Sequence, residues 1–429
     1  SLHVFPVGYQ LMSLPWDFSS MDPATLLGVT AGSLRMATWE TGAARYRAYP
    51  NAPADRFRLG RGYWLNLAGA ADLAQEGTPA TSPYSMRLEQ GWNLVGDPFT
   101  VGIDFYSVTV RDRNGVDHTM AEALASNIIG SRLFAYMLGG YRTVSAFVPY
   151  VGYWLLVNDS YCTLIIDRDA DALGVSGSAE ASTEMVDVDG WQLQLNAEVA
   201  GLADTATCIA TSTAASGGFD AGLDQGKPPV PGMGPYVYAT LQGSDGGNLA
   251  VDVRGSQATE TRWNLVVDTN LAGQQVELSW PAMHALPANV QPMLIDAAAG
   301  KRVYMRTNRS YCFTAGETAR QLSIVVSSDP VGQLAVAGAA ASAGAEGVSV
   351  SYTLSKAASV SVEVRNIAGR VVGRAAENEL QTTGLQSVVW NCRNSAGAKV
   401  PAGMYLISIT AATEDGQRAQ GLTSVMVTR

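Results

Sequence analysis

The sequence predicts an all-β protein built from tandem β domains. Strand-length runs of aromatic and aliphatic residues alternate with glycine, proline and asparagine turns along most of the chain, a pattern typical of short strands and tight turns. A set of motifs also occurs twice within the first 167 residues. The chain of 429 residues is long enough for three or four domains that each bury a core. We expect four domains, namely small β modules at 1–83 and 84–167, a jelly-roll-like β-sandwich at 185–330 and a final sandwich at 348–429.

The two β modules are expected from an internal duplication. The first copy reads VGYQLMSLPWDF (7–18), ATWETGAARYRAY (37–49) and GRGYWLNL (60–67), and the second reads QGWNLVGDPFT (90–100), FAYMLGGYRTV (134–144) and VGYWLLV (151–157). The aligned residues are Gly8-Tyr9 with Gly91-Trp92, Pro15 with Pro98, Trp39 with Tyr136, Tyr46 with Tyr141, and 62–65 with 152–155. These motifs resemble the GWNLV…GYWL modules of large secreted and cell-surface bacterial proteins. The resemblance implies a location rather than an activity.

Each module is expected to contain one short helix. In the second copy, Thr119 precedes a stretch whose apolar residues recur at helical spacing, and a threonine is a favourable N-cap. In the first copy, DPATLLGV (22–29) is the shorter counterpart. A stretch of small and acidic residues at 167–184 follows the second module and is predicted to be a linker.

The third domain is expected to be a β-sandwich of jelly-roll type. Ten strand-length segments separated by turn residues lie between 185 and 328, with no convincing helix among them. A loop rich in glycine and proline at 215–234 is expected at one end of this sandwich. The small residues of VGQLAVAGAAASAGAEG (331–347) predict a second linker before the last domain.

The last domain carries the most specific motif of the chain. It has a Y-x-L strand, a strand ending in G-R-x-V, and a hairpin of the form W-[DN]-G-x-[DN]-x-x-G-x-x-V-x-x-G-x-Y. The positions are occupied by Tyr352, Leu354, Gly369, Arg370, Val372, Trp390, Asn391, Asn394, Gly397, Val400, Gly403 and Tyr405. About the last 80 residues therefore resemble the immunoglobulin-like domain of the flagellar hook-capping protein, which is also found at the C-termini of exported bacterial proteins. The resemblance implies an Ig-like sandwich in an exported protein.

Cys392 departs from this motif, because it stands where glycine is expected. A glycine there indicates a turn with positive φ, which costs a residue with a Cβ roughly 1 kcal/mol or more. A disulfide offsets such a cost by ~2–4 kcal/mol, and the last domain has no other cysteine, so we expect a link to another domain or subunit. A free thiol is the alternative. Two disulfide pairings stay open. If Cys208 pairs with Cys312, Cys162 is left for Cys392, but Cys162 can equally pair with Cys208.

Composition excludes two classes of partner. The net charge of −10 and the absence of a Lys/Arg cluster disfavour nucleic acid, and no apolar run reaches the roughly 20 residues of a membrane span. Only 15% of residues are charged, so the surface is either covered by other domains or subunits, or rich in Ala, Gly, Ser and Thr. The chain starts at Ser1 without a leader, which is what a mature exported form would show.

The sequence offers little catalytic chemistry. His3, His118 and His284 are isolated, and no nucleophile elbow, phosphate loop, cofactor fingerprint or HExxH helix occurs, so we expect no enzyme and no cofactor. Asp167, Asp169 and Asp171 resemble the start of a calcium loop, but the glycine and the closing glutamate are missing, which favours a solvated linker over a metal site. Five tryptophans are candidates for a sugar-stacking platform, although their repetition favours a core role: Trp16, Trp39, Trp64, Trp92 and Trp154.

These observations favour a structural subunit of an extracellular bacterial filament, appendage or surface layer. We expect the chain to associate with itself head to tail, because contacts that do not close generate fibres. The N-terminal stretch 1–14 is a candidate donor strand for a neighbouring subunit. The alternatives are a surface adhesin that binds carbohydrate, and a secreted cargo whose last domain is a sorting tag.

Overall fold

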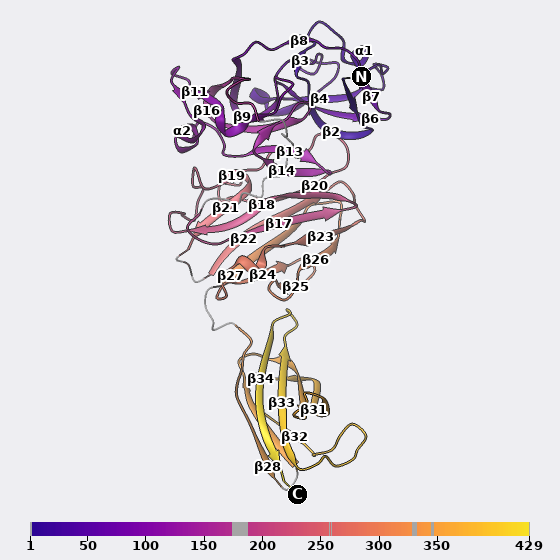
Figure 1. Ribbon diagram of the computed structural model, residues 1–429, viewed down its shortest axis with the longest axis vertical. Coiled ribbons are helices and arrows are strands. Elements are labelled where there is room, and N and C mark those ends of the chain that lie inside the picture. The colour runs from indigo at the N-terminus through magenta and orange to yellow at the C-terminus, as the bar shows by residue number, and fades with distance from the viewer. Residues whose placement is uncertain are drawn as a thin grey trace. The chain divides into compact units, whose positions relative to one another are not determined.

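The computed structural model describes residues 2–173, 188–256, 258, 260–327, 333–344 and 347–428. The chain divides into two compact units (Figure 1). The first comprises Ser1–Ala258, Trp263–Leu286 and Ser310–Leu322, and the second comprises Thr259–Arg262, Pro287–Arg309 and Ser323–Arg429. Strands supply nearly all the regular structure of both units, which confirms the predicted all-β class.

The first module has a four-stranded antiparallel sheet with the order β2-β6-β4-β5. Its elements are β1 His3–Phe5, β2 Gly8–Ser13, β3 Trp16–Asp17, α1 Pro23–Leu26, β4 Arg35–Glu40, η1 Thr41–Ala43, β5 Arg45–Ala48, β6 Gly62–Leu67, β7 Ala71–Leu73 and β8 Thr78–Pro79. β1 pairs with β7 and β2 pairs with β6, so the predicted donor strand is already paired inside its own module. Phe5 and Met12 are 1% exposed, and burying them fixes this stretch in place.

The second module repeats this order, with β9 beside β16, β16 beside β13 and β13 beside β14. Its elements are β9 Tyr84–Gly96, β10 Ile103–Asp104, η2 Phe105–Ser107, β11 Thr109–Arg111, β12 Asp117–His118, α2 Met120–Ala125, β13 Leu133–Met137, β14 Gly140–Val144, β15 Ala146–Phe147 and β16 Gly152–Ile166. Thr119 caps α2, as predicted, and the structure adds a complete capping box with Glu122, while Asp22 caps α1. The shared strand order agrees with the internal duplication.

The two modules contact each other through equivalent residues of the two repeats. Met12 bridges to Val151, and the equivalent residues of the two repeats, Val95 and Arg61, form the matching bridge. The Ser13 N–H donates to the Tyr150 carbonyl, and the aligned Gly96 N–H donates to the Gly60 carbonyl. A contact of this kind is isologous, so the duplicated modules pack as a pseudo-twofold pair within one chain.

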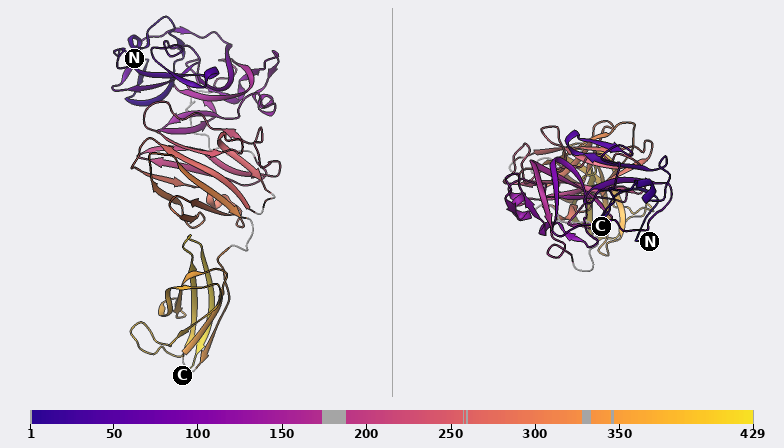
Figure 2. Two further views of the ribbon diagram at one scale, coloured as in Figure 1. Left: turned by 180° about the vertical axis from the view of Figure 1, so that it is seen from behind. Right: turned by 90° about the horizontal axis from the view of Figure 1, so that it is seen from above.

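The third region continues the first unit as one hydrogen-bonded path of strands, in the order β22-β20-β21-β18-β17-β23-β26 (Figures 1 and 2). The strands are β17 Gln192–Val199, β18 Leu202–Ser212, β19 Gln225–Gly226, β20 Val237–Gln242, β21 Asn248–Gly255, β22 Glu260–Thr269, β23 Gln275–Ser279 and β26 Ser310–Thr314, with η3 at Met283–Ala285. β18 and β21 are parallel, so the chain crosses over between them. The glycine- and proline-rich loop at 215–234 lies within that crossover.

The second unit contains a short sheet, β25-β24-β27, and the C-terminal sandwich. The short sheet consists of β24 Gln291–Asp296, β25 Lys301–Tyr304 and β27 Arg320–Ser327. The sandwich has a three-stranded sheet, β28 Val336–Gly344, β29 Gly347–Leu354 and β32 Gly384–Trp390, and a four-stranded sheet, β31 Val371–Gln381, β30 Ala358–Arg365, β33 Gly403–Ala412 and β34 Arg418–Val427. Val350, Val362, Trp390 and Ile407 fill its core.

The predicted linker at 331–347 is wrong over most of its length. Residues 336–344 form β28, which pairs with β29 and opens the sandwich that was predicted to begin at 348. An edge strand buries little side-chain area, so its alanines, glycines and serines gave no hydrophobic signal. The other predicted linker is described only at 167–173, where the Leu173 N–H donates to the Gly102 carbonyl and ties the segment to the second module. Its remainder, 174–184, lies outside the described residues.

Candidate functional site

Nine aromatic residues from the two modules form one cluster, and the eight that occupy equivalent positions of the two repeats are called the aromatic cradle. Its members come from equivalent strands of the two repeats: Tyr9, Trp39, Tyr46 and Trp64, and Trp92, Tyr136, Tyr141 and Trp154. Trp64 and Trp154 are 0% exposed, and both indoles face the same cluster. The duplication therefore placed two copies of one aromatic set side by side.

Aromatic rings interlock across the pseudo-twofold axis. Trp39 of the first module lies edge-on to Trp154 of the second, with ring centroids 5.3 Å apart. The equivalent pair in the repeats, Tyr136 and Trp64, has the same edge-on geometry at 4.7 Å. Such pairs contribute about 0.5–1.5 kcal/mol each beyond the area that they bury, so the cradle also holds the two modules together.

The segment KPPVPGMGPY at 227–236, the proline segment, lies on the cradle. Each of the four cradle tyrosines uses its hydroxyl group to bind the backbone of this segment. Tyr46 donates to the Val230 carbonyl at 2.8 Å, Tyr141 to the Pro229 carbonyl at 2.7 Å, and Tyr136 to the Pro235 carbonyl at 3.1 Å, while the Tyr9 hydroxyl accepts from the Met233 N–H at 2.9 Å. Burial raises the pKa of Tyr9, Tyr46, Tyr136 and Tyr141, so the hydroxyls keep their protons.

The composition of the proline segment suits this contact. Proline has no N–H group and a fixed φ, so the segment presents carbonyl acceptors and loses little conformational entropy when it is held. Aromatic grooves that bind proline-rich peptides work in the same way. Two glycines allow the closest approach, since a Cβ at Gly232 would lie 2.7 Å from the Tyr46 ring and a Cβ at Gly234 would lie 2.6 Å from the Tyr9 ring.

A fully buried ion pair anchors the start of the proline segment. The Lys227 ammonium group lies 2.8 Å from Asp204 Oδ1 on β18, and both side chains are 0% exposed. The carboxylate also accepts from the Ala206 and Ala239 backbone N–H groups, and the Thr207 hydroxyl accepts from Lys227. Burial lowers the pKa of Lys227, and the charge of Asp204 acts in the opposite direction. Because both charges are hydrogen-bonded, the pair is satisfied without water.

Four of the five repeated tryptophans lie in the cradle, and Trp16 lies in the core of the first module. Trp16, Trp39, Trp64 and Trp154 are buried, which agrees with the core role favoured by the sequence, and Trp92 is half-buried. The tyrosine contacts and Lys227 were not predicted as site residues. The available signal was the run KPPVPGMGP in the loop at 215–234, which was expected at one end of the third domain and was considered there only for carbohydrate binding.

The four cysteines are free thiols in the structure. Cys208 and Cys312 lie three strand spacings apart in one sheet, about 14 Å, whereas a disulfide needs Cα atoms within about 7 Å. Of the two pairings that the sequence left open, this one is not formed in the structure. Cys162 is 0% exposed in the second module's core, where burial raises its pKa to about 12, so any pairing would require this core to open.

Cys392 has the backbone conformation that the motif predicts for glycine. Its φ is +56°, in the left-handed region. Its side chain is half-buried against the sandwich core, and the thiol lies 4.0 Å from the Trp390 carbonyl, so no covalent bond offsets the strain. A link from Cys392 to another subunit stays a prediction.

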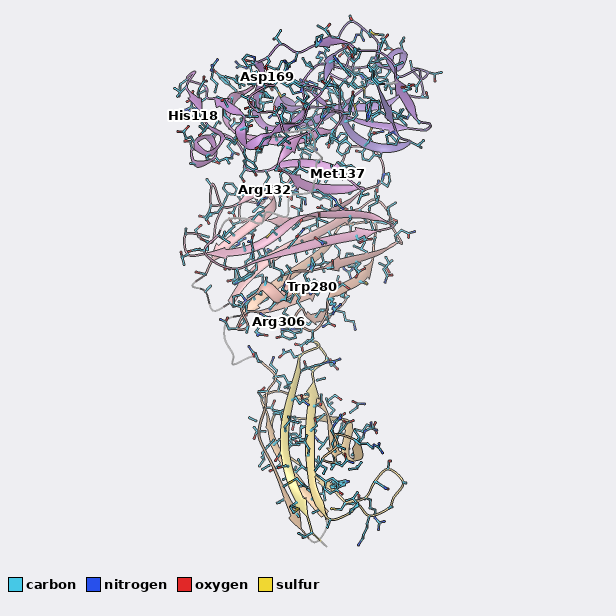
Figure 3. The ribbon with its side chains drawn as sticks, viewed as in Figure 1. His118, Arg132, Met137, Asp169, Trp280 and Arg306 are labelled. Carbon is cyan, nitrogen blue, oxygen red and sulfur yellow. The ribbon has the colours of Figure 1, made fainter. Side chains whose placement is uncertain are left out.

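The three aspartates that resemble the start of a calcium loop point to different partners. Asp167 accepts from the Asp169 N–H at 2.9 Å, Asp169 pairs with Arg168, and Asp171 turns back to the Asp167 N–H at 2.8 Å. Figure 3 labels Asp169 in the second module. No group of three His, Cys, Asp or Glu side chains suited to a metal ion occurs among the residues that the structure describes.

The three histidines also serve separate local contacts. His3 stacks on Tyr150 with ring centroids 4.0 Å apart, and burial lowers its pKa. His118, labelled in Figure 3, lies 3.4 Å from the Asp112 carboxylate, and His284 lies in η3. The structure does not bring these residues together in one catalytic arrangement.

Comparison with known protein families identifies the last domain. Residues 338–415 match the family model described as the FlgD Ig-like domain. This match confirms the resemblance of the C-terminal domain to the hook-capping protein. The model does not extend to the first 167 residues, so their resemblance to bacterial surface modules stays a prediction. A search of curated proteins finds no match to the chain.

Several solved structures align with the chain at low similarity. A tetra-tandem repeat from the extending region of a large adhesion protein has 14% identity over 77% of this chain and 92% of that chain, with a TM-score of 0.17. Dimeric latent PorU from Porphyromonas gingivalis has 9% identity over 88% and 36%, with a TM-score of 0.19. The BSP domain of a biofilm-associated protein has 8% identity over 98% and 90%, with a TM-score of 0.15. TM-scores this low show no common overall arrangement.

Proposed function

We propose that the chain is a structural subunit of an extracellular bacterial assembly, a filament, appendage or surface layer that forms by self-association of tandem β domains. The observation that carries this proposal is the aromatic cradle. The chain uses its largest aromatic cluster, with all four tyrosine hydroxyls, to bind its own proline segment. A rigid joint between successive β domains is what a load-bearing subunit requires.

The last domain supports a location outside the cytoplasm. Residues 338–415 match the FlgD Ig-like domain, the family whose resemblance implied an exported protein. In the described part of the chain, no helix is long and apolar enough to cross a bilayer. We place the protein at the cell surface or beyond it, without catalytic activity, cofactor or nucleic-acid partner.

Self-association is supported by apolar side chains on the outer face of the C-terminal four-stranded sheet. Met404 and Met426 are direct neighbours across β33 and β34, and they are 46% and 52% exposed. Leu406 and Leu422 extend the same face, at 40% and 57% exposure. We call these four residues the outer apolar face. Contiguous exposed apolar residues indicate an interaction surface, and we assign this one to a second copy of the chain.

Electron microscopy of the full chain, with sedimentation over a concentration series, tests the proposal. We expect regular fibres or sheets that grow with concentration, and Leu422→Ser should abolish or weaken them by removing apolar contact area. Leu385→Ser is the matched control, since Leu385 is 77% exposed on β32 of the other sheet and lies outside the outer apolar face. Dispersed monomers at every concentration, with and without reductant, would contradict the proposal.

A further inference from the structure

A second feature of the first unit is a cleft that the cradle does not occupy. It lies between the second module and the glycine-rich loop of the third region, and its volume is about 400 Å³. The module supplies α2 and the turn after it, and the loop supplies residues 219–226. Ligand sites have volumes of roughly 300–1,000 Å³ and occur preferentially where domains meet. We call this cavity the side cleft.

Aromatic rings line the side cleft, and several of them are accessible. Phe219 is 49% exposed and Tyr106 is 41% exposed, and both line this one cavity. Trp92 also lines the cleft, half-buried and in edge-on contact with Phe134 at 5.8 Å. The loop backbone at Gly226 approaches the Trp92 indole closely, since a Cβ at this position would lie 3.3 Å from it.

Polar side chains lie beside the rings in the lining of the cleft. Asn158 Nδ2 donates to Asn127 Oδ1 at 2.8 Å, which leaves Asn127 Nδ2 as a donor and Asn158 Oδ1 as an acceptor side by side. The Arg132 guanidinium, labelled in Figure 3, is oriented by Gln225 Oε1 at 3.1 Å. The lining thus combines flat apolar faces with adjacent hydrogen-bond donors and acceptors.

The charged groups of the side cleft favour an uncharged ligand and binding over cleavage. Arg132 and Asp224 are of opposite sign, so the lining carries no net charge among its described residues. Asp224 accepts backbone N–H bonds on both oxygens, from Val253 at 2.7 Å and from Asp220 at 2.7 Å. A carboxylate engaged in this way orders the loop, and it is not presented as a general base.

We propose that the side cleft binds a neutral glycan, with sugar rings stacked on Phe219 and Trp92 and vicinal hydroxyl groups bonded to the Asn127–Asn158 pair. Sugar C–H faces are apolar and flat, which suits stacking on aromatic rings. Each hydroxyl both donates and accepts, so two adjacent hydroxyls match one amide N–H and one amide carbonyl. This binding activity goes beyond the proposed structural role, and it would fix an extracellular subunit to a polysaccharide surface.

Calorimetric titration of the full chain with neutral oligosaccharides tests the proposal. The panel contains cello-, malto-, laminari-, manno- and galacto-oligosaccharides, each raised to millimolar concentration, where weak glycan binding is measurable. At least one should bind, and Phe219→Ala should weaken its affinity at least fivefold. Because Phe219 is exposed, we expect this variant to keep its fold, and circular dichroism checks that it does.

Val116→Ala is the matched control, because Val116 is 52% exposed on the same module and does not line the side cleft. Its affinity should equal that of the natural chain. The proposal is overturned if no neutral oligosaccharide binds, or if Phe219→Ala and Asn127→Ala bind as tightly as the control. Self-association is measured separately, so the structural role and the glycan site succeed or fail independently.

Discussion

The joint between the modules and the third region depends on the close approach at Gly232 and Gly234, and Gly232→Ala tests the first of these contacts. A Cβ at Gly232 would lie 2.7, 2.8 and 2.9 Å from three atoms of the Tyr46 ring. The ring has little freedom to move, since it lies edge-on to Trp39 at 4.8 Å and its hydroxyl donates to the Val230 carbonyl. Overpacking costs about 1–3 kcal/mol, and loss of that hydrogen bond costs about 0.5–1.5 kcal/mol. We expect the free energy of unfolding to fall by about 2–4 kcal/mol.

Urea denaturation followed by tryptophan fluorescence measures this loss, because Trp39, Trp64 and Trp154 lie in the cradle. Two glycines of the adjoining loop serve as controls. Gly217 has no neighbouring atom within 4 Å and an ordinary φ, so Gly217→Ala should be neutral. Gly222 has open space but a φ of +87°, so Gly222→Ala should show backbone strain alone, about 1 kcal/mol. If Gly232→Ala behaved like Gly217→Ala, the proposed clamping of the proline segment would be wrong.

Three further substitutions probe other parts of the account. Lys227→Met leaves the Asp204 charge buried and unpaired, so thermal unfolding should show a loss of about 3–5 kcal/mol, and an unchanged midpoint would refute the anchoring role. Asp97 is 0% exposed with Oδ2 unpaired, and burial raises its pKa well above the usual value. The folded state therefore binds this proton more tightly than the unfolded state, and the free energy of unfolding falls as pH rises from about 4 through the folded pKa. Asp97→Asn should flatten this slope in urea titrations across pH, and an equal slope in the variant would contradict the assignment. Cys392→Gly removes the strain of a non-glycine residue in the left-handed region and should stabilise the last domain by about 1 kcal/mol. Hydrogen exchange at β33 measures this gain, and a loss of protection would show that the thiol contact outweighs the strain.

Local patterns in the sequence were sufficient for much of the fold. The duplicated GYWL motifs predicted two modules of the same kind, and their sheets have the same strand order. Thr119 marked the start of α2 as its N-cap, and the glycine-like position of Cys392 predicted its positive φ. Each of these features depends on residues close together in the chain, where spacing constrains geometry directly.

Features that join distant residues were missed. The cradle tyrosines lie 88 to 224 residues away from the backbone groups that they bind, and no local pattern connects them to KPPVPGMGP. Strand β28 was not predicted, because an edge strand of small residues resembles a linker in composition. Cys208 and Cys312 share a sheet but do not pair, because β17 and β23 lie between their strands.

We infer that the cradle joins the two modules and the third region permanently, so that they unfold as one cooperative unit. Hydrogen exchange of the full chain, read by mass spectrometry, tests it most directly. We predict that β6 and β16 of the modules exchange together with β18 and β20, and that Gly232→Ala separates the two sets by speeding exchange in the modules. Exchange of the modules at their own rate in the natural chain, unaffected by Gly232→Ala, would contradict the claim.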